Sequence, residues 1–235
     1  LAQFNNVHLA AADWELSKEY ENILNKNVEI QPTALLGNIT KETNNKDKHK
    51  KQVILYCGDA KENKGFLELP QIIDTLNLNL QNHDIEFIVQ YTLTNDQTKL
   101  VQTTQELEQL AKQYSNLTVI GRFLSHQELL DMFKSSSMVI LNYDESAYAQ
   151  QSSGVLWLAV YFNLHIVSFT STWCEREVER LGGQYSLVTF SSNLSENVAK
   201  LHGKKANEYG SISAAKNAYY EQLYSDVGYW LLHGM

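Results

Sequence analysis

The sequence predicts an α/β fold, a Rossmann-like parallel sheet of about six strands with helices on both faces. Short apolar runs alternate along the chain with amphipathic segments of helical periodicity, an order typical of strand–helix–strand units. The apolar runs are nearly continuous, which indicates strands buried on both faces of a parallel sheet. With 235 residues, of which 43% are hydrophobic, the chain is long enough to bury a sizeable core.

The first part of the chain predicts a small set of elements of its own. A short apolar strand is expected at Val7–Ala12, followed by a helix at Trp14–Asn25 whose first turn Asp13 can cap. Val28–Ile30 is expected to form another short strand. Pro32 closes that strand, because proline has no backbone N–H to donate to a sheet.

Strands and helices then alternate from Gln52 onward. The expected strands are Val53–Cys57, Ile85–Tyr91, Leu117–Ile120, Met138–Leu141, His165–Phe169 and Tyr185–Val188. The expected helices are Lys64–Leu76, Thr103–Tyr114, His126–Lys134, Val155–Phe162 and Glu175–Arg180. Ser125 followed by Glu128 forms a capping-box pattern at the start of one helix. Because such sheets bind ligands beyond the carboxyl ends of their strands, the residues just after each strand are the informative ones.

Composition divides the chain into four segments. Residues 1–36 are expected to be the tail of a preceding domain, and residues 37–51 a linker, because Lys41–Lys51 is polar throughout. A basic membrane-surface patch is the alternative for this run. Residues 52–212 form the predicted Rossmann-like domain, and residues 213–235 a C-terminal helix rich in aromatic side chains. Since the chain begins with leucine rather than methionine, we expect it to be cut from something longer.

Charge and cysteine usage exclude several classes of function. The formal net charge of −8 argues against a nucleic-acid-binding surface, which needs clustered lysine and arginine. The two cysteines are isolated and the seven histidines are scattered, so neither a disulfide framework nor a zinc site is expected. No apolar run reaches the roughly 20 residues of a membrane span, and no secretory signal pattern is present. A reducing, cytoplasmic location is therefore the expectation.

The loop after the first strand of the large domain contains a candidate anion site. Gly58 permits a tight strand exit, and Lys61 and Lys64 follow at the expected start of a helix. Cations at that end oppose the helix dipole, so a bound anion would explain their position; two solvated surface lysines are the alternative. A Walker loop is excluded, because the Gly-x-x-x-x-Gly-Lys-Ser/Thr spacing is absent.

A second candidate segment is the turn Ser152-Ser153-Gly154, which precedes an apolar helix. Small residues there leave backbone N–H groups free to face a diphosphate, and the helix dipole favours negative charge. An ordinary strand–helix connection with a serine N-cap is the alternative. Together with Lys61 and Lys64, this turn predicts one diphosphate site at the rim of the sheet. That prediction requires that no carboxylate plugs the cleft between them.

Two further strand exits contain residues suited to a nucleotide sugar. Gly121 and Arg122 follow the third strand of the large domain, where backbone groups and the guanidinium plane could contact a base. Tyr143 and Tyr148 follow the fourth strand and could shape a sugar pocket, with Glu145 accepting hydrogen bonds from hydroxyls. An exposed turn and a solvated loop are the alternatives for these residues.

Three motifs together resemble the C-terminal half of GT-B glycosyltransferases, close to glycosyltransferase family 4. They are VILYCGDAKENKGFLELPQII, NLTVIGRFLSHQELLDMFKSSSMVILNY and YAQQSSGVLWLAVYFNLHIVSFTSTWCEREVERLGG, and they span residues 52–190 in the family's order. The resemblance implies a domain that binds a nucleotide-diphosphate sugar and transfers the sugar with retention, without a metal or other cofactor. The implied acceptor is a glycan, as in polysaccharide biosynthesis, or a lipid-linked molecule, with peripheral membrane association left open.

The resemblance also assigns roles to residues of this chain. Lys61 and Lys64 are the implied catalytic residues, since they would neutralise the diphosphate as it leaves. The family usually has a glutamate that holds the ribose hydroxyls, and Leu158 occupies its place. That departure keeps open a degenerate domain used as a binding or scaffolding module; a sugar-nucleotide epimerase, a third possibility, lacks its expected Glu and His pairs. The donor-binding candidates are Gly58, Gly121, Arg122, Tyr143, Glu145, Tyr148, Ser152, Ser153 and Gly154.

Overall fold

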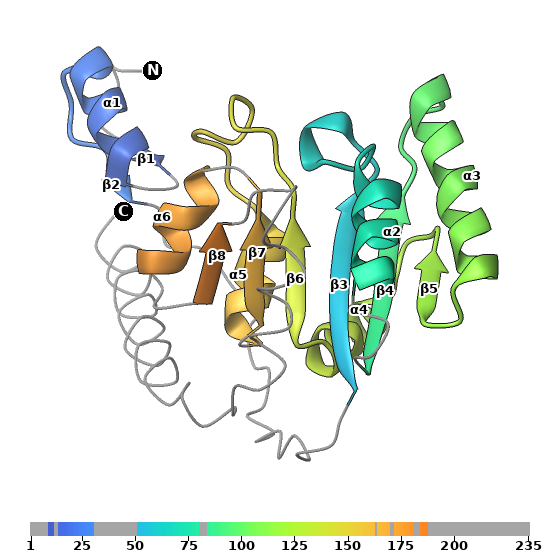
Figure 1. Ribbon diagram of the computed structural model, residues 1–235. Coiled ribbons are helices and arrows are strands. Elements are labelled where there is room, and N and C mark those ends of the chain that lie inside the picture. The colour runs from blue at the N-terminus through green and yellow to red at the C-terminus, as the bar shows by residue number, and fades with distance from the viewer. Residues whose placement is uncertain are drawn as a thin grey trace. The chain divides into compact units, whose positions relative to one another are not determined.

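The chain divides into two compact units, of which the first contains its N-terminal elements and the second the large sheet (Figure 1). The structure, a computed structural model, describes residues 9–11, 14–30, 51–79, 84–162, 164–169, 172–180 and 184–187. The helix predicted at 214–230 and the domain boundaries predicted at residues 36 and 212 lie outside these ranges and stay predictions.

In the described residues of the first unit, one helix connects two short parallel strands. β1 (Ala10–Ala11) pairs with β2 (Glu29–Ile30), and α1 (Trp14–Leu24) connects them. The buried hydrophobic residues described in this unit are Ala11, Leu16 and Val28. The predicted order of strand, helix and strand is confirmed. Of the first predicted strand, Ala10 and Ala11 pair with β2, and residues 7, 8 and 12 lie outside the described residues.

The second unit is built on a parallel sheet of six strands, which confirms the predicted fold class. Its strands lie in the order β5-β4-β3-β6-β7-β8, so that β3 and β6 are neighbours at the centre. Strands added after β3 run to one edge, and the chain then returns to add β6 on the other side. That return is a topological switch point, beside which open α/β sheets bind their ligands. The bounds are β3 (Gln52–Asp59), β4 (Ile85–Thr92), β5 (Leu117–Ile120), β6 (Met138–Leu141), β7 (His165–Ser168) and β8 (Gln184–Leu187).

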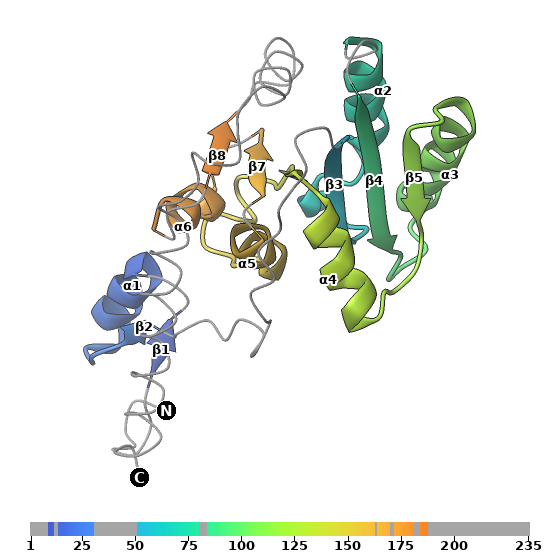
Figure 2. The ribbon, with the colours of Figure 1, turned by 90° about the horizontal axis from the view of Figure 1, so that it is seen from below.

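Helices cover both faces of this sheet, as right-handed crossovers require (Figures 1 and 2). α2 (Leu69–Asn79) and α3 (Thr98–Gln113) lie on one face, and α4 (His126–Ser135) and α5 (Gly154–Tyr161) lie on the other. α6 (Trp173–Arg180) connects β7 to β8. The predicted capping box of α4 is confirmed: Ser125 Oγ accepts from the Glu128 N–H at 3.3 Å, and Glu128 Oε2 accepts from the Ser125 N–H at 2.7 Å.

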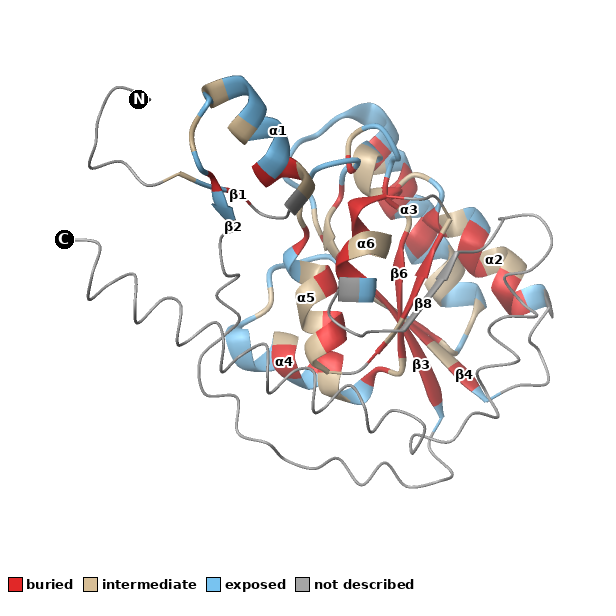
Figure 3. Cartoon of the chain, turned by 90° about the vertical axis from the view of Figure 1, so that its left-hand side faces the viewer, coloured by how far each residue is buried: buried red, intermediate tan, exposed pale blue. Residues whose placement is uncertain are grey.

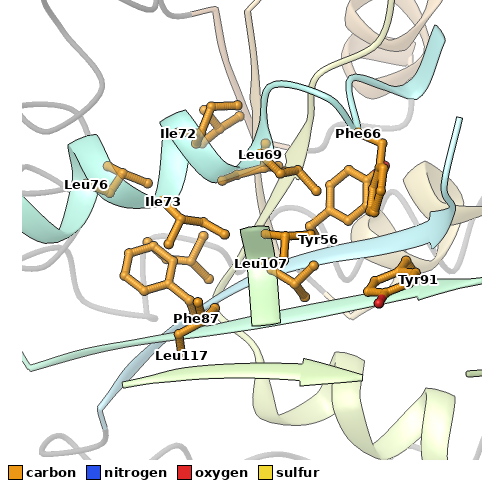
Figure 4. Packing of buried hydrophobic residues seen from close by; sticks show 14 of the residues in the cluster. Tyr56, Phe66, Leu69, Ile72, Ile73, Leu76, Phe87, Tyr91, Leu107 and Leu117 are labelled. Atoms are coloured by element: carbon orange, nitrogen blue, oxygen red, sulfur yellow. The ribbon is translucent and has the colours of Figure 1, made fainter. Parts of the chain in front are cut away.

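The main core lies between α2 and the sheet (Figure 4). Four apolar residues of α2 recur at helical spacing, which places them on one face of the helix. That face packs on β3 and β4, whose residues are mostly buried (Figure 3). The four helix residues, each at most 2% exposed, are Leu69, Ile72, Ile73 and Leu76.

The helix after β3 begins later than the sequence predicts. It was expected from Lys64, but a short 3-10 turn, η1 (Glu62–Lys64), comes first and α2 begins at Leu69. Gly65 ends the turn because it adopts the left-handed backbone conformation, with φ +68°. Phe66 then enters the core, with its ring centroid 5.1 Å from that of Tyr91. The two lysines of this loop are therefore not at the start of an α-helix.

Truncation of a core residue of α2 tests this packing. We expect Leu76→Ala to lower the free energy of unfolding by about 2 to 5 kcal/mol, because it leaves a cavity at a fully buried position. Leu78, 59% exposed on the same helix, provides the matched control, and Leu78→Ala should change stability little. Urea unfolding of both variants makes the comparison, and equal losses would contradict the described face of α2.

Candidate functional site

Two loops meet at the switch point, one after β3 and one after β6 (Figure 1). The backbone N–H of Asp144 donates to the carbonyl of Asn63 across them at 3.0 Å. A Cβ added to Gly65 would lie 2.0 Å from the carbonyl oxygen of Asn142, so that glycine alone fits between the loops. The approach is therefore at backbone level, and it holds the two strand exits together as one rim.

Lys64 lies beside the start of α5. A Cβ added to Gly58 would lie 3.5 Å from Lys64 Nζ and 4.0 Å from Val155 Cγ2, so one small space borders both groups. The Lys64 side chain is only 19% exposed. The hydroxyl of Tyr56 also donates to the Lys64 carbonyl at 3.4 Å. Gly58 of β3 and Lys64 of the turn that follows it thus lie close to Val155 in the first turn of α5.

The carboxylate of Asp59 contacts both lysines. Asp59 Oδ2 lies 3.1 Å from Lys61 Nζ and 3.2 Å from Lys64 Nζ. Burial of this carboxylate opposes its charge, but the hydrogen bond from Lys61 and the charge of Lys64 together lower the pKa of Asp59 below its ordinary value of 3.8. This acidic partner was not among the candidate residues predicted from the sequence. Its signal was visible in the sequence, as an aspartate ending an apolar strand beside them.

The turn before α5 is a capped helix start. Ser153 Oγ accepts from the Leu156 N–H at 3.3 Å and lies 2.8 Å from the Tyr143 hydroxyl. This hydroxyl is engaged within the protein, so the serine N-cap interpretation holds for Ser153. A Cβ added to Gly154 would meet no atom within 4 Å, so the space over the helix start is open there, and Ser152 beside it is half-buried.

The two tyrosines of the loop after β6 are buried and pack against each other. Tyr143 and Tyr148 are each 2% exposed, and their rings stack with centroids 4.1 Å apart. Burial raises the pKa of Tyr148 to about 12, so its phenol stays neutral. Rings buried in this way offer little surface for a sugar, whereas Glu145 is exposed. Asp144 shapes the loop tip, where its carboxylate accepts from the Ala147 N–H at 2.8 Å.

Gly121 and Arg122 follow β5, which β4 separates from β3. Arg122 Nη2 lies 2.6 Å from Glu128 Oε1, and this bond, followed by those from Ser125, lowers the pKa of Glu128 to about 2. The Arg122 carbonyl accepts from Gln90 Nε2 at 2.8 Å. The structure therefore does not bring Arg122 to the lysines, and its guanidinium already has an acidic partner.

The described residues form neither a metal site nor an activated cysteine nucleophile. No group of three or more His, Cys, Asp and Glu side chains there could hold a metal ion. Cys57 and Cys174 are free and buried, and burial raises the pKa of each thiol to about 12, so neither is an activated nucleophile. Leu158 is half-buried on α5 and provides no hydrogen-bonding side chain. None of the helices in the ranges described is long and apolar enough to cross a membrane.

Comparison with known proteins places the fold among glycosyltransferases. No protein-family model matches the sequence, and no curated protein matches it significantly. A Burkholderia xenovorans α,α-trehalose-phosphate synthase (UDP-forming), in complex with glucose-6-phosphate, has a similar structure, with a TM-score of 0.57 and 14% identity. That likeness covers 75% of this chain and 40% of the synthase, so the chain spans less than half of that protein's length.

Two further structures have the same fold. A trehalose-6-phosphate structure from E. coli, bound with UDP-2-fluoro glucose, has a TM-score of 0.55 and 14% identity over 74% of this chain and 43% of that one. The C-terminal domain of the glycosyl transferase group 1 family protein LpcC from Francisella tularensis has a TM-score of 0.51 and 17% identity, over 75% and 85%. These neighbours are GT-B glycosyltransferases, which agrees with the resemblance of the motifs. At such identities the likeness shows the fold alone.

Substitution of Gly65 tests the contact that holds the rim together. We expect Gly65→Ala to cost about 1 to 3 kcal/mol from the left-handed backbone alone, and more from the overlap with Asn142. Gly154→Ala is the matched control, because its added Cβ meets nothing and alanine is the better helix former. Thermal unfolding separates the two, and a Gly65→Ala protein as stable as the parent would contradict the described contact.

The titration of Asp59 tests its bonds to the lysines. Because its pKa is lowered in the folded protein, its contribution to stability is present above the ordinary value of 3.8 and is lost as the pH falls through the folded value. NMR titration of the carboxyl carbon should give a midpoint below 3.8 in the parent protein. Combined Lys61→Ala and Lys64→Ala should raise that midpoint. A midpoint insensitive to both lysines would show that the carboxylate has other partners.

Proposed function

We propose that this chain is the donor-binding part of a glycosyltransferase, and that it binds a nucleotide-diphosphate sugar. The observation that carries the proposal is the meeting of Lys64 and the start of α5 at the switch point between β3 and β6. Both groups favour an anion, one through its ammonium and the other through the helix dipole. The likeness to glycosyltransferase structures supports a diphosphate as that anion.

The proposed chemistry is stabilisation of a leaving group. When a glycosidic bond forms, negative charge develops on the diphosphate that departs from the sugar, and positive groups held in place lower the barrier. Lys64 is suited to this role because it is 19% exposed and fixed beside the sheet, whereas Lys61 is 46% exposed and could follow the ligand. In this proposal the two lysines supply the charge that a metal ion would otherwise supply.

The finer features of the reaction are proposals that rest on the resemblance of the sequence motifs. They are retention of configuration, membership of glycosyltransferase family 4, a glycan or lipid-linked acceptor, a role in polysaccharide biosynthesis, and a cytoplasmic location. Because the chain spans 40% of the trehalose-phosphate synthase, the activity of a whole enzyme is also a proposal.

A second candidate function is a degenerate glycosyltransferase-like module that binds or organises another protein. Two observations favour it. Asp59 already holds both lysines, and Leu158 stands where the resembled family has a glutamate for ribose hydroxyls. Under this alternative the surface of the domain binds another protein, and the switch point binds no nucleotide.

Binding of nucleotide sugars separates the two candidates. We expect a UDP-, GDP- or dTDP-linked sugar to raise the melting temperature of the parent protein. At a ligand concentration of roughly 100 times the dissociation constant, the gain should correspond to about 2.7 kcal/mol. Combined Lys61→Ala and Lys64→Ala should abolish the rise, because both proposed diphosphate contacts are removed.

The control variant removes the same charge elsewhere. Lys99 and Lys112 are exposed lysines of α3, and their combined change to alanine should leave the ligand-induced rise intact. If no sugar nucleotide at millimolar concentration shifts the parent protein, the module interpretation is favoured. If the two double variants lose the rise equally, the effect is one of overall charge and the proposed site is wrong.

A further inference from the structure

The carboxylate of Asp59 occupies the position that an anion would take between the two lysines. Both ammonium groups approach the same oxygen, Oδ2, at 3.1 and 3.2 Å. Asp59 is the last residue of β3, so its backbone is fixed by the parallel ladder, where it pairs with Thr92. The carboxylate is therefore held at the rim by the sheet itself.

The charges of this cluster decide which ligands can compete. Two ammonium groups and one carboxylate have a net charge of +1, so an incoming anion meets both attraction and repulsion. The side chains of Asp59 and Lys64 are only 33% and 19% exposed, which reduces screening by solvent. A singly charged anion gains little by displacing Asp59, because it replaces the carboxylate with a group of the same charge. A diphosphate has more charge and two centres, and the start of α5 offers it further donors.

We propose that Asp59 is an internal competitor that sets the anion specificity of this rim, so that only a ligand of diphosphate type displaces it from the lysines. The inference rests on the proposed function for the identity of the ligand, but its physical content is the competition between Asp59 and the anion. On binding, the Asp59 side chain turns away while its backbone stays in β3. Because every anion must displace the Asp59 carboxylate, the free energy of the Asp59–lysine contacts reduces the binding free energy of each anion.

The test measures pyrophosphate and UDP binding by isothermal titration calorimetry in the parent protein and in Asp59→Asn. The asparagine keeps the size of the side chain and removes its charge, so we expect pyrophosphate and UDP to bind roughly tenfold more tightly or better. Inorganic phosphate should gain measurable binding in the same variant. Glu62→Gln is the matched control, because it removes one negative charge from the exposed surface of the same turn and should change these affinities little.

The outcomes distinguish this inference from the proposed function. If both proteins bind pyrophosphate, Asp59→Asn more tightly than the parent, but neither binds UDP, the competition is supported and the nucleotide-sugar function is overturned. If the parent binds UDP and Asp59→Asn does not strengthen binding, the function survives and the competition is overturned. Equal gains in Asp59→Asn and Glu62→Gln also overturn it, since general charge then explains the change. If neither protein binds either ligand while circular dichroism shows both folded, both proposals fail.

Discussion

The pairing of β3 with β6 is the constraint on which the rest of this site depends. Ile54 and Leu55 lie in register with Met138 and Val139, so two strands far apart in the sequence end side by side. Their exits are then forced together, and Gly65 resolves the crowding by leaving space for the Asn142 carbonyl. Asp59 at the end of β3, the lysines after it and the tyrosines after β6 are positioned by that junction. A loop on a sheet without the switch point would have no partner loop to meet.

The fold could be predicted from the sequence because its signals are local. Continuous apolar runs gave β5 and β6 their correct ends, and the Ser125–Glu128 pattern gave the start of α4, since each depends on adjacent residues. The start of α2 was wrong because periodicity did not reveal that Gly65 would take a left-handed conformation. That conformation accompanies the close approach of Gly65 to Asn142, a tertiary contact that the local sequence pattern does not reveal.

The candidate site was predictable only in part, for a related reason. Strand exits indicated where Lys64 and the turn before α5 would lie, because the topology determines their place. The partners of each side chain were not accessible in the same way. Asp59 was not selected beside the lysines that it binds. Tyr143 and Tyr148 were expected to shape a sugar pocket or to lie in a solvated loop, although both are buried. A fold similar to that of glycosyltransferases therefore coexists with a rim whose charges are largely satisfied internally.

A crystal structure with a bound sugar nucleotide tests most directly whether an anion reaches Lys64 beside the end of β3. We expect a phosphate oxygen of the ligand within hydrogen-bond distance of Lys64 Nζ, near the first turn of α5, with the Asp59 carboxylate moved off the lysine. A nucleotide bound elsewhere, with Asp59 still bonded to both lysines, would contradict the account.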